Sequence, residues 1–115
     1  MPQPVIVLTT VAESFDSRSL ARSLVEARLA ACVNIIDRVV SIYRWEGSVS
    51  EDAEQLLVIK TSDERVDALR DALLAQHSYD VPEFVVLPIE ATSDAYGAWL
   101  LESVSPQQKE DPDRQ

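Results

Sequence analysis

The chain has 115 residues, a length typical of one domain, and its 46% apolar and 26% charged residues are ordinary for a globular protein. Twenty acidic residues against ten basic ones give a formal net charge of −10, so the surface repels phosphate backbones and nucleic acid is not expected as a partner. Divalent cations are compatible with this charge, although an acidic surface more often serves only solubility. Cys32 is the single cysteine, which excludes an internal disulfide and a zinc site built from paired thiols.

The apolar segments are too short for a membrane protein. No apolar run approaches the roughly 20 residues needed to cross a bilayer, so we expect no membrane partner. Residues 1–8, MPQPVIVL, lack the basic region and the cleavage site of a secretory signal peptide. We therefore expect a cytoplasmic protein.

The first elements are a strand and a helix. Residues 4–10, PVIVLTT, are rich in β-branched side chains and predict a central strand that is buried on both faces. Polar residues that can cap a helix follow at Ser14, Asp16 and Ser17. Apolar residues then recur at helical spacing, at Leu20, Leu24, Ala27 and Ala31. This pattern predicts a helix over residues 17–30.

Residues 31–61 predict two long strands joined by a turn at residues 46–48, where Gly47 supplies a positive φ. The first arm is apolar on both faces, with Val33, Ile35, Val39, Tyr43 and Trp45 on one and Ile36, Val40 and Ile42 on the other. Asp37 and Arg38 interrupt both rows. One helical layer cannot cover both faces, so we expect part of this ribbon to pack against another subunit.

The return arm, residues 53–61, leads into a second helix that Ser62 or Asp63 caps. Its predicted buried side consists of Val66, Leu69, Leu73 and, as a further candidate, His77. The proline in residues 77–83, HSYDVPE, predicts an extended connection there. It leads to a strand at residues 84–89, in which Pro88 indicates a sheet edge or a bulge.

The last helix is short and amphipathic, with Tyr96, Trp99, Leu100 and either Ser103 or Val104 on its apolar side. Residues 105–115 hold no aliphatic or aromatic residue and predict a disordered tail, so the folded domain spans residues 1–104. The order of elements predicts an α+β fold, the ferredoxin-like split β-α-β sandwich, with a long central β-hairpin and a C-terminal helix. The second sheet face then needs cover from another subunit or from the terminal helix.

Five short motifs follow in order, LAACVNI (29–35), SIYRWEG (41–47), IKT (59–61), HSYDVPE (77–83) and LPI (87–89). Over residues 5–104 their conjunction resembles the CutA family of divalent-cation-tolerance proteins. The resemblance implies a ferredoxin-like subunit in a tightly packed homotrimer, a cytoplasmic location in bacteria and a role in tolerance of copper and other divalent metals. It also implies no established catalytic reaction, so we do not expect an enzyme.

The chain departs from this family pattern at two places. Many members have Pro-Gly where this chain has Asp37 and Arg38, at a bend in the long second strand, so a bulge there is expected to be built differently. Some members have a cysteine, a proposed copper ligand, where this chain has Thr9. The loss of this soft donor weakens the case for copper and predicts poor binding of copper(I).

The candidate metal ligands are His77, Asp80, Glu83 and Cys32. His77 is the only histidine, Asp80 and Glu83 are its neighbours in the sequence, and Cys32 can join them only through folding. A mixed set of nitrogen and oxygen donors suits copper(II) or zinc.

Structural interpretations compete with each of these roles. Backbone carbonyls can satisfy a histidine at a helix end, and a cysteine within AACVNI can be a small buried apolar residue. Glu54, Lys60 and Glu83 form either a small ion site between subunits or an ion-pair network that fixes the subunit register. Packing at a subunit interface, rather than a ligand cage, is the interpretation that we favour for the aromatic residues Tyr43, Trp45, Tyr79, Tyr96 and Trp99.

Three functions are compatible with these residues. The first is a homotrimer that responds to divalent metal ions, and the second is a PII-like small-molecule sensor with a ligand in the cleft between subunits. The second requires basic residues for phosphate, and the acidic second half offers only Lys60, Arg65 and Arg70 before the tail. The third, an acid–base enzyme that uses His77 and Glu83, has the least support because no nucleophile is paired with a base.

Overall fold

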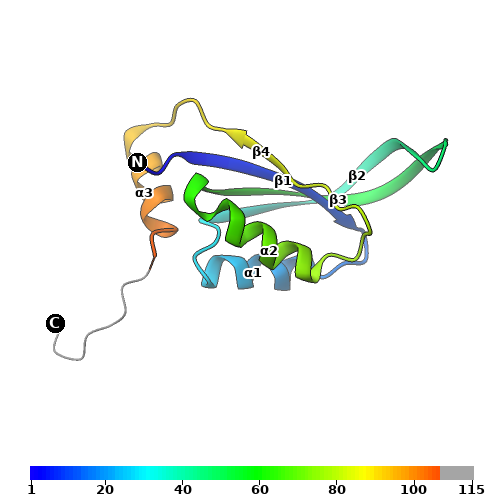
Figure 1. Cartoon of the computed structure of the whole chain (residues 1–115), viewed down its shortest axis with the longest axis horizontal. Coiled ribbons are helices and arrows are strands. Elements are labelled where there is room, and N and C mark those ends of the chain that lie inside the picture. The colour runs from blue at the N-terminus through cyan, green and yellow to red at the C-terminus, as the bar shows by residue number, and fades with distance from the viewer. Residues whose placement is uncertain (107–115) are drawn as a thin grey trace.

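The computed structural model describes residues 1–106 of the chain. Its elements are β1 (Pro4–Ala12), α1 (Ser17–Glu26), β2 (Cys32–Trp45), β3 (Ser48–Ser62), α2 (Val66–Gln76), β4 (Val85–Pro88) and α3 (Asp94–Ser103), with a 3-10 helix at Asp63–Arg65 before α2. This order is the predicted one (Figure 1). The tail expected at residues 105–115 lies, from residue 107 on, outside the described residues. Among the helices of residues 1–106, none has the length and apolar character needed to span a membrane.

The strands form an antiparallel sheet in the order β2-β3-β1-β4. β1 lies between β3 and β4, which confirms the prediction of a central strand. Its residues alternate between buried and half-buried, so the predicted burial on both faces is wrong for the single chain, in which the helices cover only one sheet face. β4 lies at a sheet edge, where the missing N–H of Pro88 interrupts no further pairing. α1 and α2 cover the same face of the sheet (Figure 1), so the α+β class and the ferredoxin-like arrangement are confirmed.

The main core lies between this sheet face and the two helices. Alternate side chains of β1 and β3 point into it, because successive side chains of a strand point to opposite faces. Leucines at helical spacing on α1 and α2 meet them. The buried members of this core are Val7, Val11, Leu20, Leu24, Ala30, Leu57, Ile59, Leu69 and Leu73.

The first helix ends at Glu26, four residues before the predicted end at Ala30. Arg28 adopts a left-handed φ of 60°, and the Leu29 N–H donates to the Leu24 carbonyl at 2.9 Å. Glycine usually occupies the left-handed position of such a helix end, so its ordinary sequence signal is missing here. The apolar period continues to Ala30 because that side chain is buried in the core after the helix has ended.

The helix starts differ in how they are capped. Asp16 caps α1, and its Oδ1 accepts from the Ser19 N–H at 3.1 Å, which agrees with the predicted cap. The predicted cap of α2 is wrong. Ser62 makes no side-chain cap bond, and Asp63 Oδ1 instead accepts from the Gln3 N–H at 2.9 Å. The 3-10 helix provides the transition into α2 in place of a side-chain cap.

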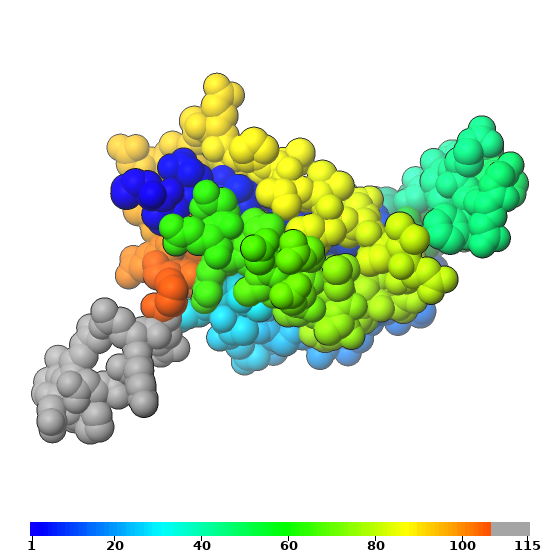
Figure 2. All heavy atoms as spheres, viewed as in Figure 1, coloured from blue at the N-terminus to red at the C-terminus, as the bar shows by residue number. Residues whose placement is uncertain are grey.

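β2 and β3 form a long hairpin whose tip projects from the body of the molecule (Figure 2). The turn at Glu46 and Gly47 has φ values of 50° and 82°, which is the type I′ geometry that suits the twist of a two-residue hairpin. The predicted turn is therefore confirmed. The return strand begins at Ser48, before the predicted residue 53, because the acidic residues 51 and 52 hide the alternation in the sequence.

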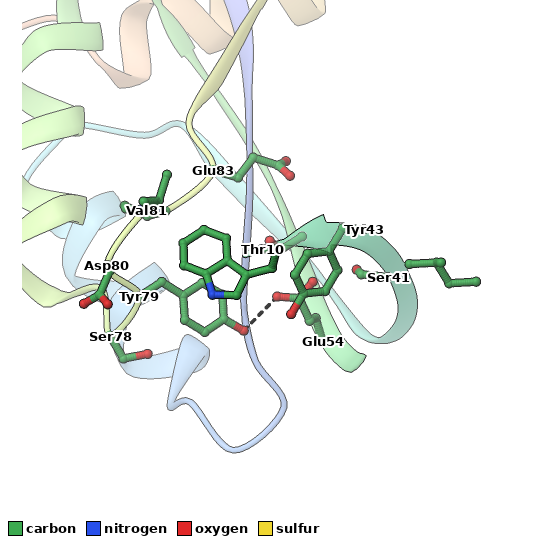
Figure 3. Close-up of a pocket in the computed structure, with 12 residues that line it drawn as sticks. Thr10, Ser41, Tyr43, Glu54, Ser78, Tyr79, Asp80, Val81 and Glu83 are labelled. Carbon is green, nitrogen blue, oxygen red and sulfur yellow. Dashed lines mark hydrogen bonds between the residues drawn. The ribbon is translucent and has the colours of Figure 1, made fainter. Parts of the chain in front are cut away.

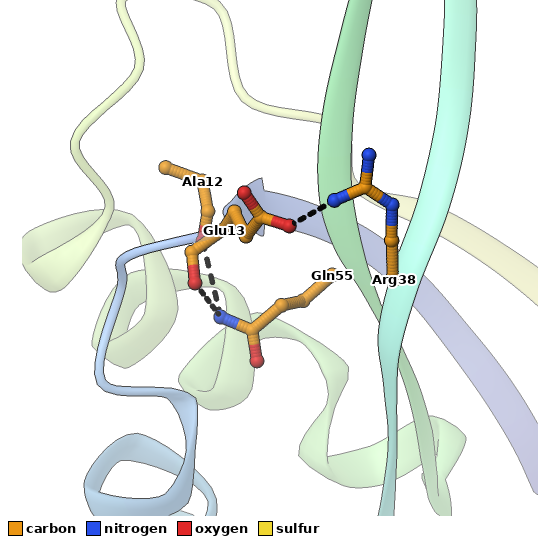
Figure 4. A network of polar contacts seen from close by, with 4 residues as sticks. All are labelled: Ala12, Glu13, Arg38 and Gln55. Carbon is orange, nitrogen blue, oxygen red and sulfur yellow. Dashed lines mark hydrogen bonds and ion pairs between the residues drawn. The ribbon is translucent and has the colours of Figure 1, made fainter.

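A β-bulge interrupts the hairpin at Asp37 and Arg38, where the pairing register of β2 and β3 shifts. Arg38 forms an ion pair with Glu13 at 2.7 Å. Opposite the bulge, the buried Gln55 amide donates to the carbonyls of Ala12 and Glu13 at 3.0 and 3.2 Å (Figure 4). The bend therefore forms without Pro-Gly, and polar contacts to the end of β1 hold it.

The apolar side of α3 divides between two environments. Leu100 and Val104 are buried and form a second, small core with Ala31. Tyr96 and Trp99 are 39% and 47% exposed, whereas Leu100 on the same predicted apolar side is buried. The two rings are neighbours, with centroids 5.4 Å apart.

Replacement of Thr9 by valine should raise the free energy of unfolding by about 1 kcal/mol, because an unpaired buried hydroxyl carries a desolvation cost. Thr9 is fully buried, and its Oγ1 has no hydrogen-bond partner among the described residues. Thr61 is the matched control, since it is equally buried but its Oγ1 donates to the Leu29 carbonyl at 2.8 Å. Urea denaturation should show that Thr9→Val stabilises and Thr61→Val destabilises. A less stable Thr9→Val protein would contradict this.

Candidate functional site

A groove of about 780 Å³ opens where the base of the β2-β3 hairpin meets the connection between α2 and β4 (Figure 3). Thr10 of β1 and Glu54 of β3 lie in this groove. Their side chains are on the sheet face opposite to the one that α1 and α2 cover. The groove is lined by Thr10, Ser41, Ile42, Tyr43, Trp45, Glu54, Ser78, Tyr79, Asp80, Val81, Pro82 and Glu83.

His77, the predicted nitrogen ligand, follows the last residue of α2, and both of its ring nitrogens contact the backbone. Nε2 lies 2.8 Å from the Thr10 carbonyl, and Nδ1 accepts from the Tyr79 N–H at 3.2 Å. Since a carbonyl can only accept, Nε2 carries the proton and donates it. A metal could bind the imidazole only after one of these bonds is broken.

The other predicted ligands lie at different places. Asp80 and Glu83 both line the groove (Figure 3). Cys32 is the first residue of β2 and pairs with Lys60 of β3. Thr10, which contacts His77, pairs with Leu56 of β3. Lys60 and Leu56 are four residues, or about 13 Å, apart along β3, so Cys32 lies far from His77. Among residues 1–106 no group of three or more His, Cys, Asp or Glu residues could hold a metal ion. Within one chain, the predicted set therefore does not form a complete metal site.

Glu54 is a groove residue whose environment the sequence did not reveal. It is only 7% exposed, and its Oε2 accepts from the Tyr79 hydroxyl at 2.7 Å (Figure 3). Burial of the Tyr79 side chain, and then this hydrogen bond to the carboxylate, raise the pKa of Tyr79 well above its usual value of 10.0. The two residues are 25 positions apart, so no local pattern couples them.

Glu54 was expected to share an ion site or an ion-pair network with Lys60. No ion pair joins them within the described residues, and the Lys60 Nζ lies 5.9 Å from the centroid of the Tyr96 ring. At the hairpin side of the groove, the Tyr43 hydroxyl donates to Asp52 Oδ2. This bond to a carboxylate raises the pKa of Tyr43.

The groove is acidic and aromatic. Glu54, Asp80 and Glu83 are among its lining residues, whereas no Lys or Arg of residues 1–106 lines it. The ion pairs within residues 1–106 join Arg38 to Glu13 and Arg70 to two aspartates, so they neutralise none of the three groove carboxylates. Such a site favours cations and disfavours phosphate groups.

The fold and the groove together define a small ferredoxin-like domain with a long projecting hairpin and an acidic groove at the hairpin base. The family model described as CutA1 divalent ion tolerance protein matches residues 5–103. The chain belongs to this family, which confirms the resemblance carried by the five sequence motifs. The family is described by ion tolerance and not by a reaction.

Named relatives support the assignment. The divalent-cation tolerance protein CutA of Thermus thermophilus is 47% identical over 98 residues, which cover 85% of this chain and 95% of that protein. The chloroplastic protein CutA of Arabidopsis thaliana is 44% identical over 99 residues, which cover 86% of this chain but 54% of that protein. The chain thus spans about half the length of this plant relative.

Solved structures agree with the fold. The crystal structure of CutA1 from Oryza sativa has a TM-score of 0.86 and 42% identity, and the match covers 93% of this chain and 97% of that one. A CutA structure from Archaeoglobus fulgidus, described as periplasmic, has a TM-score of 0.84 and 31% identity, with coverage of 89% and 99%. Because relatives carry both chloroplastic and periplasmic descriptions, a cytoplasmic location of this protein stays a prediction.

Replacement of Tyr79 by phenylalanine should lower the free energy of unfolding at pH 7 by about 1 to 3 kcal/mol, since the hydrogen bond to a carboxylate is lost. The raised pKa of Tyr79 means that the folded state holds this proton more tightly, so its stabilising effect is present below pH 10.0 and is lost as the pH rises further. The difference between the parent and Tyr79→Phe should therefore shrink in denaturation measurements above pH 10. Tyr96→Phe, at an exposed ring, is the control, and an identical pH profile for all three proteins would contradict the expectation.

Proposed function

We propose that the protein is a cytoplasmic homotrimer that acts in tolerance of divalent cations such as copper or zinc. Membership of the divalent ion tolerance family supports the general role. The acidic groove at the hairpin base is the single structural observation that carries the proposal, because it gathers carboxylates that no basic residue of the described chain neutralises.

Exposed apolar strands support the trimer. The sheet order leaves β2 and β4 at its edges, and both carry exposed apolar side chains, which are Ile36, Val40 and Ile42 on β2 and Val85, Val86 and Leu87 on β4. An edge strand with such side chains pairs readily with another chain. Contact between the β2 edge of one subunit and the sheet of the next closes into a ring of three.

The cation site of this proposal is completed between subunits. Asp80 and Glu83 provide oxygen donors in one chain, and His77 can contribute only if it releases Thr10 or Tyr79. A neighbouring subunit then supplies the remaining donors. A PII-like sensor of phosphate-bearing ligands receives less support, because the groove offers no basic side chain from the described residues.

Light scattering should give a particle of three chains of 12.8 kDa, about 38 kDa, and the denaturation midpoint should rise with protein concentration. Val40→Glu should dissociate the trimer, because a charge would be buried at the interface. Leu74→Glu is the control, since Leu74 on α2 is an exposed apolar side chain that does not belong to an edge strand. A monomeric parent, or equal effects of both substitutions, would contradict the trimer.

Calorimetric titration with Cu²⁺ and with Zn²⁺ at moderate salt should show saturable binding that Glu83→Gln weakens by about tenfold or more, because a donor of the site is lost. Glu26→Gln, an exposed carboxylate on α1, removes the same charge elsewhere and should leave binding unchanged. His77→Ala tests the histidine: a loss of affinity would assign it as a ligand, and unchanged affinity would restrict the donors to oxygen. Equal binding by every variant would mean that the ions only condense on the acidic surface.

A further inference from the structure

A second groove, of about 440 Å³, lies between α1 and the edge strand β2. Val33 and Ile35 of β2 form its floor. Their partners on β3 are buried in the main core, so both side chains point to the sheet face that the helices cover. The other lining residues belong to α1 and are Arg18, Ala21, Arg22, Val25 and Glu26. This groove and the acidic groove are therefore on opposite faces of the sheet.

Two arginines of the α1-β2 groove lack a carboxylate partner within residues 1–106. Arg18 and Arg22 are exposed and one helical turn apart, so their guanidinium groups lie on the same side of α1. None of the ion pairs in this part of the chain includes either of them. Guanidinium groups bind carboxylates through paired N–H donors, so this part of an otherwise acidic protein favours an anion.

The apolar surface beside the arginines restricts the kind of anion. Val25 is 42% exposed, and Val33 and Ile35 are only partly buried against the core. Together they offer an aliphatic surface that gains free energy by contact with hydrocarbon. Glu26 in the same groove repels a second negative charge, which disfavours phosphate and other dianions. The groove therefore fits a single carboxylate attached to an aliphatic body.

We propose that the α1-β2 groove binds an aliphatic monocarboxylate, with its carboxylate between Arg18 and Arg22 and its hydrocarbon against Val25, Val33 and Ile35. The site lies at a boundary between subunits of the proposed trimer, because β2 is a sheet edge along which a second copy pairs. That copy covers the backbone edge of β2 and forms the outer wall of the groove, while α1 stays in the helical layer. The inference rests on the proposed trimer for this wall alone.

The test uses the full-length, assembled protein in dilute buffer, because salt screens exposed charges. Calorimetry compares hexanoate with n-hexanol, n-hexylammonium, acetate and inorganic phosphate. We expect saturable binding of hexanoate and at least about tenfold weaker binding of the other four, since each lacks either the single carboxylate or the aliphatic body. Methyl NMR spectra should show that hexanoate shifts the signals of Val25, Val33 and Ile35, which line the groove.

Variants then locate the site. Arg22→Gln should weaken hexanoate binding by about tenfold and leave the particle mass by light scattering unchanged. Arg70→Gln removes the same charge from α2 and should bind as the parent does. Val25→Ala should weaken the binding of hexanoate but not of acetate, because it removes only hydrocarbon contact. Glu26→Gln should bind hexanoate more tightly, since a repulsive charge is lost.

Four results would overturn the proposal. They are equal binding of hexanoate and n-hexanol, tighter binding of phosphate than of hexanoate, an equal loss with Arg22→Gln and Arg70→Gln, and no hexanoate binding by the parent. The last result, together with dissociation of the trimer by Arg22→Gln, would mean that a carboxylate of the second copy occupies the groove. A monomeric parent that binds hexanoate would instead contradict the trimer and its outer wall, and it would support the contacts with the two arginines.

Discussion

The side chain of Gln55 holds together the parts of the molecule on which the site depends. Its amide group donates to the carbonyls of Ala12, Glu13 and Phe15, and its Oε1 accepts from the Ser17 hydroxyl. The end of β1, the start of α1 and the bulged hairpin therefore share one buried polar contact. Because buried polar groups must be paired, few other arrangements of this corner satisfy all of these atoms.

Two neighbouring residues of β3 point to opposite faces of the sheet, one toward the core and one toward the groove. Gln55 points toward α1, and the preceding residue, Glu54, points to the opposite face of the sheet and into the groove. His77 completes this arrangement, because its contacts with Thr10 and Tyr79 fix the start of the connection that covers Glu54. In the single chain the histidine positions Tyr79.

At the other end of the sheet, arginine side chains secure α3. The Arg28 guanidinium donates to the carbonyls of Glu102 and Ser103 at 3.5 and 3.4 Å, and Arg65 Nε donates to the Arg28 carbonyl at 3.1 Å. The last carbonyls of a helix lack partners within it, so these bonds satisfy groups that would otherwise need water. Arg28 and Arg65 therefore act structurally, at the end of the sheet that is distant from the acidic groove.

Local patterns in the sequence determined the order of strands and helices and the turn at Gly47, because periodicity and turn chemistry act over a few residues. They restricted Pro88 to a sheet edge or a bulge, and the sheet order decided for the edge. The five motifs also determined the family. Only the tertiary structure decided that Glu54 is buried, that both nitrogens of His77 are occupied and that Cys32 lies far from them. These contacts join residues 25 and 67 positions apart, and they depend on strand register and on the path of the 77–83 connection, which no local pattern encodes.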